Sequence, residues 1–268
     1  MKNEVFNGQR FWNWFKYDMK QMWRNQMKAA LGIGFSGLIF YALAIMFNLV
    51  ADHVWQGPSG GGRALVFVFA LVALQLYQTK TYGFLTDKSK GSAWLMAPAS
   101  TLEKWVSMMI MTLIVIPVLF FVAYLGVDWL LCTVDHSCGA SMISAFNDVL
   151  SQYSAAYEAG ETWITMGSAA WFIIASLCGN LLYFLLCGTV FKKHKILYAI
   201  AITFCLSMVF SLALGPVLGV YAETNAEELF TSGSQAAQTT VYVYSVISTV
   251  LALCLAGANY YRLKTIKH

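Results

Sequence analysis

The sequence predicts an all-α, polytopic membrane protein, and three observations support that fold class. Hydrophobic residues make up 59% of the 268 residues and charged residues 11%, whereas soluble domains are typically about 45–50% apolar and about 25% charged. The apolar residues fall in blocks long enough for membrane helices, which need roughly 20 residues each. Basic residues are confined to alternate connecting segments. This composition argues against a cytosolic enzyme, a disordered chain and a nucleic-acid-binding domain.

Six apolar segments are long enough to cross a bilayer, so we expect six transmembrane helices. They cover residues 29–50, 64–80, 105–131, 165–191, 196–221 and 241–261. The second is the weakest, because Gln75, Gln78 and Thr79 make one end polar, and we expect it to continue as a helix beyond the membrane. The first is expected to be retained, since a long basic and aromatic region precedes it and its apolar core exceeds that of a signal peptide.

The distribution of charge predicts the orientation of these helices. If the N-terminus is cytoplasmic, all but one of the 17 Lys and Arg residues fall on the cytoplasmic side, and the exception is Arg63. Nine of the 13 Asp and Glu residues then fall on the outer side. Positively charged segments resist translocation, so we expect both termini in the cytoplasm, with a basic tail at residues 262–268.

Residues 1–28 are predicted to form a cytoplasmic amphipathic helix before the six-helix domain of residues 29–261. Apolar side chains recur at helical spacing from Phe11 to Met22. Lys16, Lys20 and Arg24 lie on another face and suit anionic lipid headgroups. Two interpretations stay open: an ordinary anchor along the membrane, or a helix that also packs on a partner.

Motifs for catalysis are missing from the sequence. The loop Gly57-Pro58-Ser59-Gly60-Gly61-Gly62-Arg63-Ala64 is similar to a phosphate-binding loop, but Arg63 replaces the lysine and Ala64 the hydroxyl residue, so we expect a flexible turn. The four histidines have no metal-ligand spacing. We therefore predict no catalytic residue, no metal and no cofactor, and do not expect an enzyme.

The inner loop of residues 81–104 is the most informative segment. Residues 87–91 are polar, and residues 92–96 form a short segment expected to expose Trp94, Leu95 and Met96. Pro98 ends it, and Ser100 and Glu103 have the spacing of a capping box that starts the third span. One interpretation is a well-made connection between helices. The other is a stiff cytoplasmic helix that offers apolar side chains to a soluble partner.

The stretch GSAWLMAPAS at residues 91–100, followed by Glu103-Lys104, resembles the inner loop of type-2 ABC exporter permeases. That family also has an amphipathic elbow helix, six spans and inner termini, so the similarity in organisation extends over essentially the whole chain. The sequence departs from the family pattern in two places. Asp87-Lys88-Ser89-Lys90 replaces a frequent Glu-x-Glu, and Trp94 occupies a region that often holds an acid.

The resemblance implies a coupling helix at residues 87–96 that docks on a separate ATP-hydrolysing subunit. The implied contact residues are Asp87, Lys88, Lys90, Gly91, Trp94, Leu95, Met96 and Pro98. It also implies two permease copies, identical or paralogous, in a cell membrane, with an exported substrate that the sequence does not identify. By resemblance, residues 215–239 dip back into the membrane, although a kinked span and a plain loop remain open. A non-transporting membrane scaffold that recruits a cytoplasmic partner is the alternative function.

The largest predicted outer loop covers residues 132–164. Cys132 and Cys138 flank a short polar stretch there and can pair as a disulfide if the loop lies outside the cytoplasm. The other four cysteines lie in apolar blocks and are expected to pack as small hydrophobic residues. Part of residues 141–157 is expected to form an amphipathic helix on the outer surface.

Overall fold

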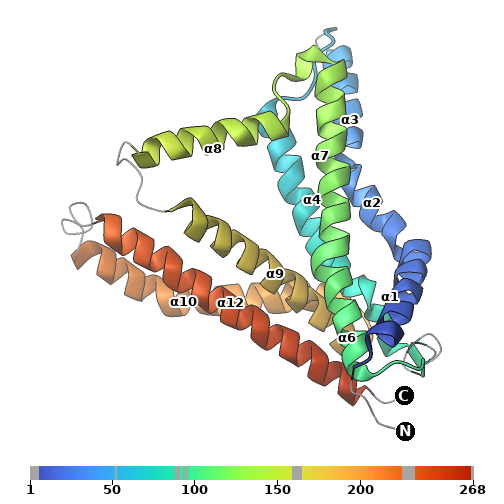
Figure 1. The fold of residues 1–268 in the computed structure, drawn as a ribbon. Coiled ribbons are helices and arrows are strands. Elements are labelled where there is room, and N and C mark those ends of the chain that lie inside the picture. The colour runs from blue at the N-terminus through green and yellow to red at the C-terminus, as the bar shows by residue number, and fades with distance from the viewer. Residues whose placement is uncertain are drawn as a thin grey trace.

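The computed structural model describes residues 6–51, 53–87, 91–92, 94, 96–158, 165–224 and 233–266; for residues 25, 209–211, 213–224 and 233–240 it describes the backbone. All regular structure in these residues is helical (Figure 1). The helices are α1 (Gly8–Met22), α2 (Lys28–Gly34), α3 (Ser36–Ala51), α4 (Gly60–Thr81), α6 (Thr101–Ile110), α7 (Ile116–Val134), α8 (Met142–Glu158), α9 (Met166–Val190), α10 (Lys195–Thr224) and α12 (Gly233–Thr265).

Four helical stretches in the described residues are long and apolar enough to cross a membrane: Gly60–Thr86, Thr101–Val134, Met166–Val190 and Val241–Thr265. The pair α2 and α3, bent by 42°, adds a fifth if it is one span. The chain is therefore a multi-pass membrane protein. The predicted span at residues 196–221 falls within α10, of which Lys195–Met208 is apolar but shorter. The proposed dip at residues 215–239 includes residues 225–232, which lie outside the described residues.

The N-terminal helix is continuous with the first apolar segment. A π-helical turn at Trp23–Met27 joins α1 to α2, and the sharp bend comes later, at Phe35. Phe15 and Met22 are buried on α1, together with Trp14 and Asp18. Lys28, the last residue of the predicted N-terminal segment, is the first residue of α2, and a helical turn of different winding leads into it.

The glycine-rich segment does not form the flexible turn expected from the sequence. Residues 60–63 form the first turn of α4, not a flexible turn, because the Ser59 hydroxyl caps the helix by accepting from the Gly62 N–H at 3.3 Å. Pro117 lies in the first turn of α7, where its missing N–H leaves no helical hydrogen bond unmade, and a π-helical turn at Met111–Val115 comes just before that helix.

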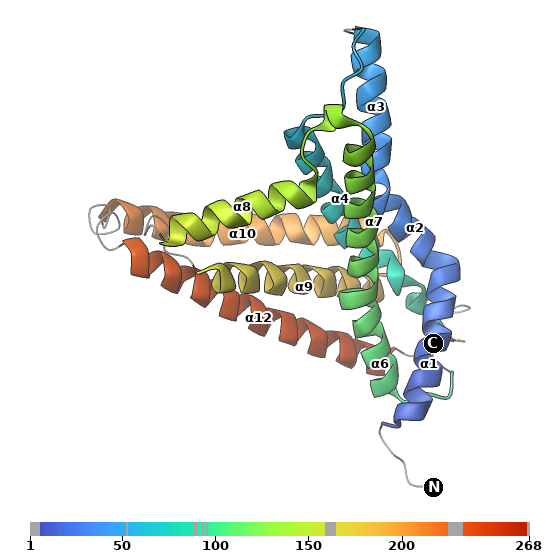
Figure 2. The same ribbon diagram turned by 45° about the horizontal axis from the view of Figure 1, so that its top comes forward.

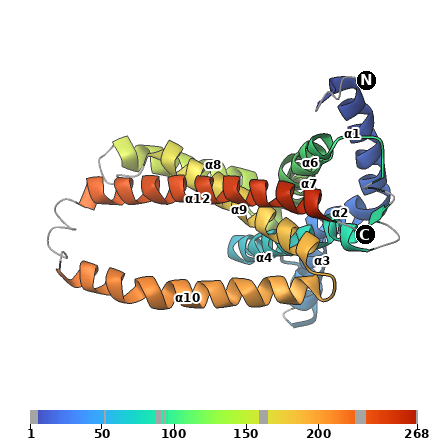
Figure 3. The same ribbon diagram turned by 90° about the horizontal axis from the view of Figure 1, so that it is seen from below.

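The helices form two groups that diverge from a shared end. One group contains α2, α3, α4, α6 and α7, and the other contains α9, α10 and α12, which run across the direction of α7 (Figure 2). Helix α9 contacts α10 and α12 and also packs on α4, so it joins the groups (Figure 3). The start of α1 and the end of α12 both lie at the shared end, near α6 (Figure 1).

The main buried cluster is centred on this shared end. Trp14, Tyr82, Trp94, Met108 and Met111 belong to one continuous set of buried side chains. These residues come from α1, the segment after α4, the loop, α6 and the following π-turn. The core therefore holds Tyr82, Leu85 and Trp94 of the predicted inner loop together with the N-terminal helix.

Candidate functional site

The candidate site lies where α1, the described residues between Tyr82 and Ser100 and the first two turns of α6 meet, and we call it the loop junction. It contains the segment that the sequence predicts to bind a partner. Two buried carboxylates, Asp18 and Glu103, organise it, and each is 0% exposed. Buried carboxylates require hydrogen bonds or ion pairs to offset their lost hydration, so the partners of these two residues define the site.

Glu103 joins the start of α6 to the start of α1. The capping box predicted from the sequence is confirmed: the Ser100 N–H donates to Glu103 Oε2 at 2.9 Å, and the Glu103 N–H donates to Ser100 Oγ at 3.2 Å. Glu103 Oε1 also accepts from the Asn7 N–H at 2.9 Å and forms an ion pair with Arg10 Nη2 at 2.8 Å. The local cap is therefore also a long-range contact.

Asp18 joins α1 to three other parts of the chain. Its carboxylate accepts from the Tyr82 hydroxyl at 2.8 Å, the Trp94 indole N–H at 3.2 Å and the Ser107 hydroxyl at 2.7 Å. Burial raises the pKa of Asp18 above its ordinary value, and the three hydrogen bonds oppose that rise. The sequence analysis did not single out this residue.

Trp94 does not present its ring to a partner, which corrects the expectation from the sequence. The side chain is 2% exposed, because its ring packs edge-on against Trp14 and Tyr82, with centroids 5.3 and 6.1 Å away. Lys104 Nζ lies 5.6 Å from the Trp94 ring centroid, a cation–π distance. A large aromatic ring whose N–H has a buried acceptor gains more from the core than from water.

Met96 is exposed as expected, with 83% of its surface accessible. Its N–H donates to the Ser92 carbonyl at 2.9 Å, and the Gly91 N–H donates to the Asp87 carbonyl at 2.8 Å, so the segment makes helical turns. Lys88, Lys90 and Leu95, also predicted as contacts, lie outside the described residues. Docking of a partner on this segment stays a prediction.

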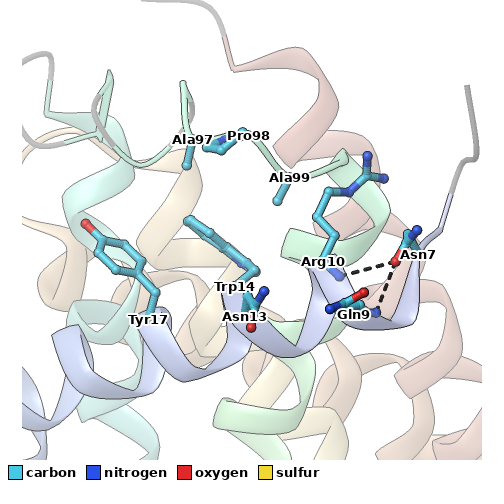
Figure 4. Close-up of a pocket in the computed structure, with 9 residues that line it drawn as sticks. All are labelled: Asn7, Gln9, Arg10, Asn13, Trp14, Tyr17, Ala97, Pro98 and Ala99. Carbon is cyan, nitrogen blue, oxygen red and sulfur yellow. Dashed lines mark hydrogen bonds between the residues drawn. The ribbon is translucent and has the colours of Figure 1, made fainter. Parts of the chain in front are cut away.

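A cavity of about 700 Å³ separates α1 from the chain that follows Met96. Figure 4 shows Ala97, Pro98 and Ala99 on one side and the α1 side chains on the other. The predicted contact residue Pro98 thus faces this space. The α1 side is mostly polar or aromatic, and its residues are Asn7, Gln9, Arg10, Asn13, Trp14 and Tyr17.

The loop junction is also attached to the second group of helices. Lys195, at the start of α10, donates to the Gly83 carbonyl and, at 2.7 Å, to the Thr86 hydroxyl. In α9, a Cβ placed on Gly188 would collide with the Thr79 carbonyl oxygen, so these backbones are in direct contact. The segment after α4 is therefore held by both helix groups.

The opposite end of α4 and α7 is held by a buried ion pair that the sequence analysis missed. Arg63 Nη1 lies 2.9 Å from Asp128 Oδ1, and each residue is 7% exposed. Arg63 Nη2 donates to the carbonyls of Cys138 and Ala140 at 2.9 and 2.7 Å. The signal was present in the sequence, because Arg63 is the one basic residue assigned to the outer side.

Cys132 and Cys138 are free thiols in the structure, and both are buried. Arg63 Nη1 donates to Cys132 Sγ at 2.8 Å, and burial raises the pKa of the Cys138 thiol to about 11. Their pairing as a disulfide stays a prediction. Beside them, Asp135 Oδ2 accepts from the Tyr41 hydroxyl at 2.5 Å, which lowers the pKa of that carboxyl to about 2.

No cluster of three or more His, Cys, Asp or Glu side chains suited to a metal ion occurs in the part of the chain that the structure describes. Comparison of the chain with protein-family models, with curated proteins and with solved structures gives no match in any of the three.

Proposed function

We propose that this chain is the transmembrane subunit of an ATP-driven exporter of the ABC type. It would cross a cell membrane six times, with both termini in the cytoplasm. Two copies, identical or paralogous, would form the pathway, and separate ATPase subunits would bind at the loop junction. ATP hydrolysis belongs to those subunits and not to this chain.

The observation that carries the proposal is the double attachment of the loop junction. On one side, Asp18 and Glu103 fix it to α1 and α6. On the other side, Lys195 fixes the segment after α4 to α10. A segment held by both helix groups can transmit a push at Met96 to both of them. Switching between two arrangements of packed helices is a common way to turn binding energy into movement.

The arrangement of the connections supports the proposed orientation. The contacts of Arg10 with Glu103 and of Lys195 with Thr86 lie in segments assigned to the cytoplasm. Arg262 in the basic tail donates to the Thr189 carbonyl, near the cytoplasmic end of the predicted span at residues 165–191. The contacts of Asp128 and Asp135 lie in segments assigned to the outside. Segments assigned to the same side of the membrane therefore contact one another, as the charge pattern requires.

Helix α1 is proposed to lie along the inner leaflet as an elbow helix. Trp12 and Trp23 are each more than half exposed, on an edge beside the buried face. Lys16, Lys20 and Arg24 are exposed next to them. Tryptophan favours the boundary between headgroups and acyl chains, and lysine and arginine favour anionic headgroups. Membrane lipid is therefore a partner of this helix.

The test uses Met96, because this side chain is exposed and its replacement leaves the core intact. The tagged full chain would be purified in mild detergent from its native membrane, and its companions identified by mass spectrometry. We expect an ATPase subunit with a phosphate-binding loop, and at least tenfold less of it with Met96→Asp. A tenfold loss corresponds to about 1.4 kcal/mol of binding free energy.

The control is Phe146→Asp on α8, because Phe146 is 62% exposed and lies on the other side of the proposed membrane. This variant should keep the ATPase at the wild-type level. Equal retention by Met96→Asp and wild type would remove the docking assignment. Absence of any ATPase, together with a soluble partner that Met96→Asp releases, would favour the alternative function of a membrane scaffold.

A further inference from the structure

Asp18 is a buried acid to which the proposed function gives only the role of attaching the loop junction. Its three hydrogen-bond donors are Tyr82 after α4, Trp94 in the loop and Ser107 in α6. One carboxyl group on α1 therefore connects three other segments that are distant from it in the sequence. Burial of this acid removes water from its carboxyl group, which costs free energy. The three contacts therefore suggest a role beyond packing.

The chemistry of the donors distinguishes this site from an ion pair. A phenol, an indole and an alcohol supply hydrogen bonds without a compensating full charge. Burial consequently favours the protonated acid and raises the pKa of Asp18 above the ordinary 3.8. The ionisable groups that face this region from the packed elements are Tyr82, Lys104, whose Nζ lies 5.6 Å from the ring centroids of Trp14 and Trp94, and the Arg10–Glu103 pair.

The Trp94 bond gives Asp18 control over the loop. Trp94 is the loop residue that reaches the carboxylate, and the exposed Met96 follows it by two residues. The indole N–H bonded to Asp18 belongs to the ring that packs between Trp14 and Tyr82, so the bond and the ring packing hold Trp94 together. The position of the exposed part of the loop is thus tied to the environment of one carboxyl group.

We propose that Asp18 is the positioning residue of the loop junction: it latches Trp94 onto α1, and ionisation of its carboxyl group favours opening of the latch. In the closed latch the acid is buried, and in the open latch it returns to water. Between the pKa values of the open and closed states, the opening equilibrium then rises by up to about tenfold per pH unit. At a pH above the pKa of the closed state, the opening equilibrium no longer changes with pH.

The test is hydrogen–deuterium exchange of the full chain in detergent, followed on peptides covering residues 91–99. Rates would be corrected for intrinsic exchange and measured between about pH 4 and pH 8, under conditions where exchange reports the opening equilibrium. In wild type, the opening equilibrium should rise with pH and then become constant. In Asp18→Asn, which imitates the neutral acid and keeps an acceptor for Trp94, it should be low and independent of pH.

Asp18→Ala should exchange fast at every pH, because the indole and both hydroxyls lose their acceptor. If that variant does not fold, Trp94→Phe removes the indole donor alone and should raise exchange at least threefold. Asp128→Asn replaces a buried aspartate at the opposite end and should leave residues 91–99 unchanged. Identical pH profiles for wild type and Asp18→Asn would overturn the proposal, as would wild-type exchange in both Asp18→Ala and Trp94→Phe.

This experiment needs no ATPase, so it can fail or succeed independently of the proposed function. A pH-dependent latch in a chain that binds no ATPase would leave the latch in place and remove the exporter assignment. Binding of an ATPase without a pH-dependent latch would support the docking site and leave Asp18 only a packing role.

Discussion

Two buried aspartates at opposite ends of the helix bundle have different partners. Asp128 pairs with the guanidinium of Arg63 at 2.9 Å, and the Met142 N–H donates to its second oxygen at 2.7 Å. Asp18 accepts from three neutral groups. Both are almost completely buried. The difference lies in whether a full opposite charge is bonded directly to the carboxylate.

This difference assigns different mechanical roles to the two ends. A buried ion pair is costly to separate, because each charge would be left buried without its partner. A buried acid held by neutral donors can change protonation state without leaving a bare counter-charge behind. The Arg63 end is therefore suited to a fixed joint, and the Asp18 end to a movable one.

The largest expected effect comes from breaking the fixed joint. Arg63→Ala would leave Asp128 buried without its guanidinium, and we expect a loss of about 3–5 kcal/mol in the free energy of unfolding. Reversible unfolding in mixed micelles, with circular dichroism as the signal, would measure it. The hydrogen bonds to the Cys138 and Ala140 carbonyls are lost as well.

The matched control removes both charges together. In Arg63→Met with Asp128→Leu, no unpaired charge remains, so most of the lost stability should return. A double variant as unstable as Arg63→Ala would show that the carbonyl contacts, rather than the charge pair, hold this end. The comparison between the two aspartates would then lose its basis.

The next effect concerns the contact between helix groups near the loop junction. Gly188→Ala should cost about 1–3 kcal/mol in unfolding free energy, because the added methyl group meets the Thr79 backbone, which cannot rotate away. Gly179→Ala is the control in the same helix, since its nearest neighbour would be the Ala252 Cβ at 3.9 Å. Both substitutions raise helix propensity equally, so their difference measures the close contact. Equal stabilities would mean that α4 and α9 have room to separate.

Local signals in the sequence predicted local structure well. Ser100 and Glu103 are three residues apart, and the capping box they predicted forms between backbone groups of the same turn. Helical spacing likewise placed Phe15 and Met22 on one face of a helix, and that face of α1 is buried in the structure. Hydropathy predicted long apolar helices, because bilayer thickness fixes their length, although only four or five candidate spans are found in the described residues.

Long-range partners were not predictable in the same way. Trp94 was expected to be exposed because three apolar residues stand together in a polar loop, yet its acceptor is Asp18, 76 residues earlier. Arg63 was assigned to a flexible turn because the segment before it is rich in glycine, and its partner, Asp128, is 65 residues later. A polar residue on an apolar helix face, such as Asp18, signals a distant partner but does not identify it.

The smallest expected effect is on the pH dependence of stability, to which Asp135 and Asp18 should contribute with opposite signs. Asp135 has a pKa of about 2 in the folded protein because the Tyr41 hydroxyl and the Ser137 N–H donate to its carboxylate. A lowered pKa means that its stabilising contribution is complete above the unfolded value of 3.8 and is lost as the pH falls from there through about 2.

Asp18 has the opposite sign, because its raised pKa makes the ionised form unfavourable in the closed state, so stability falls as the pH rises above 3.8. Unfolding curves for wild type, Asp135→Asn and Asp18→Asn between about pH 2 and pH 7 separate the two. Asp135→Asn should be less stable than wild type near neutral pH, and this difference in unfolding free energy should disappear in acid. Asp18→Asn should become more stable relative to wild type as the pH rises toward neutral. If the difference in stability between variant and wild type changed with pH in the same direction for both variants, the distinction between a fixed and a movable end would be contradicted.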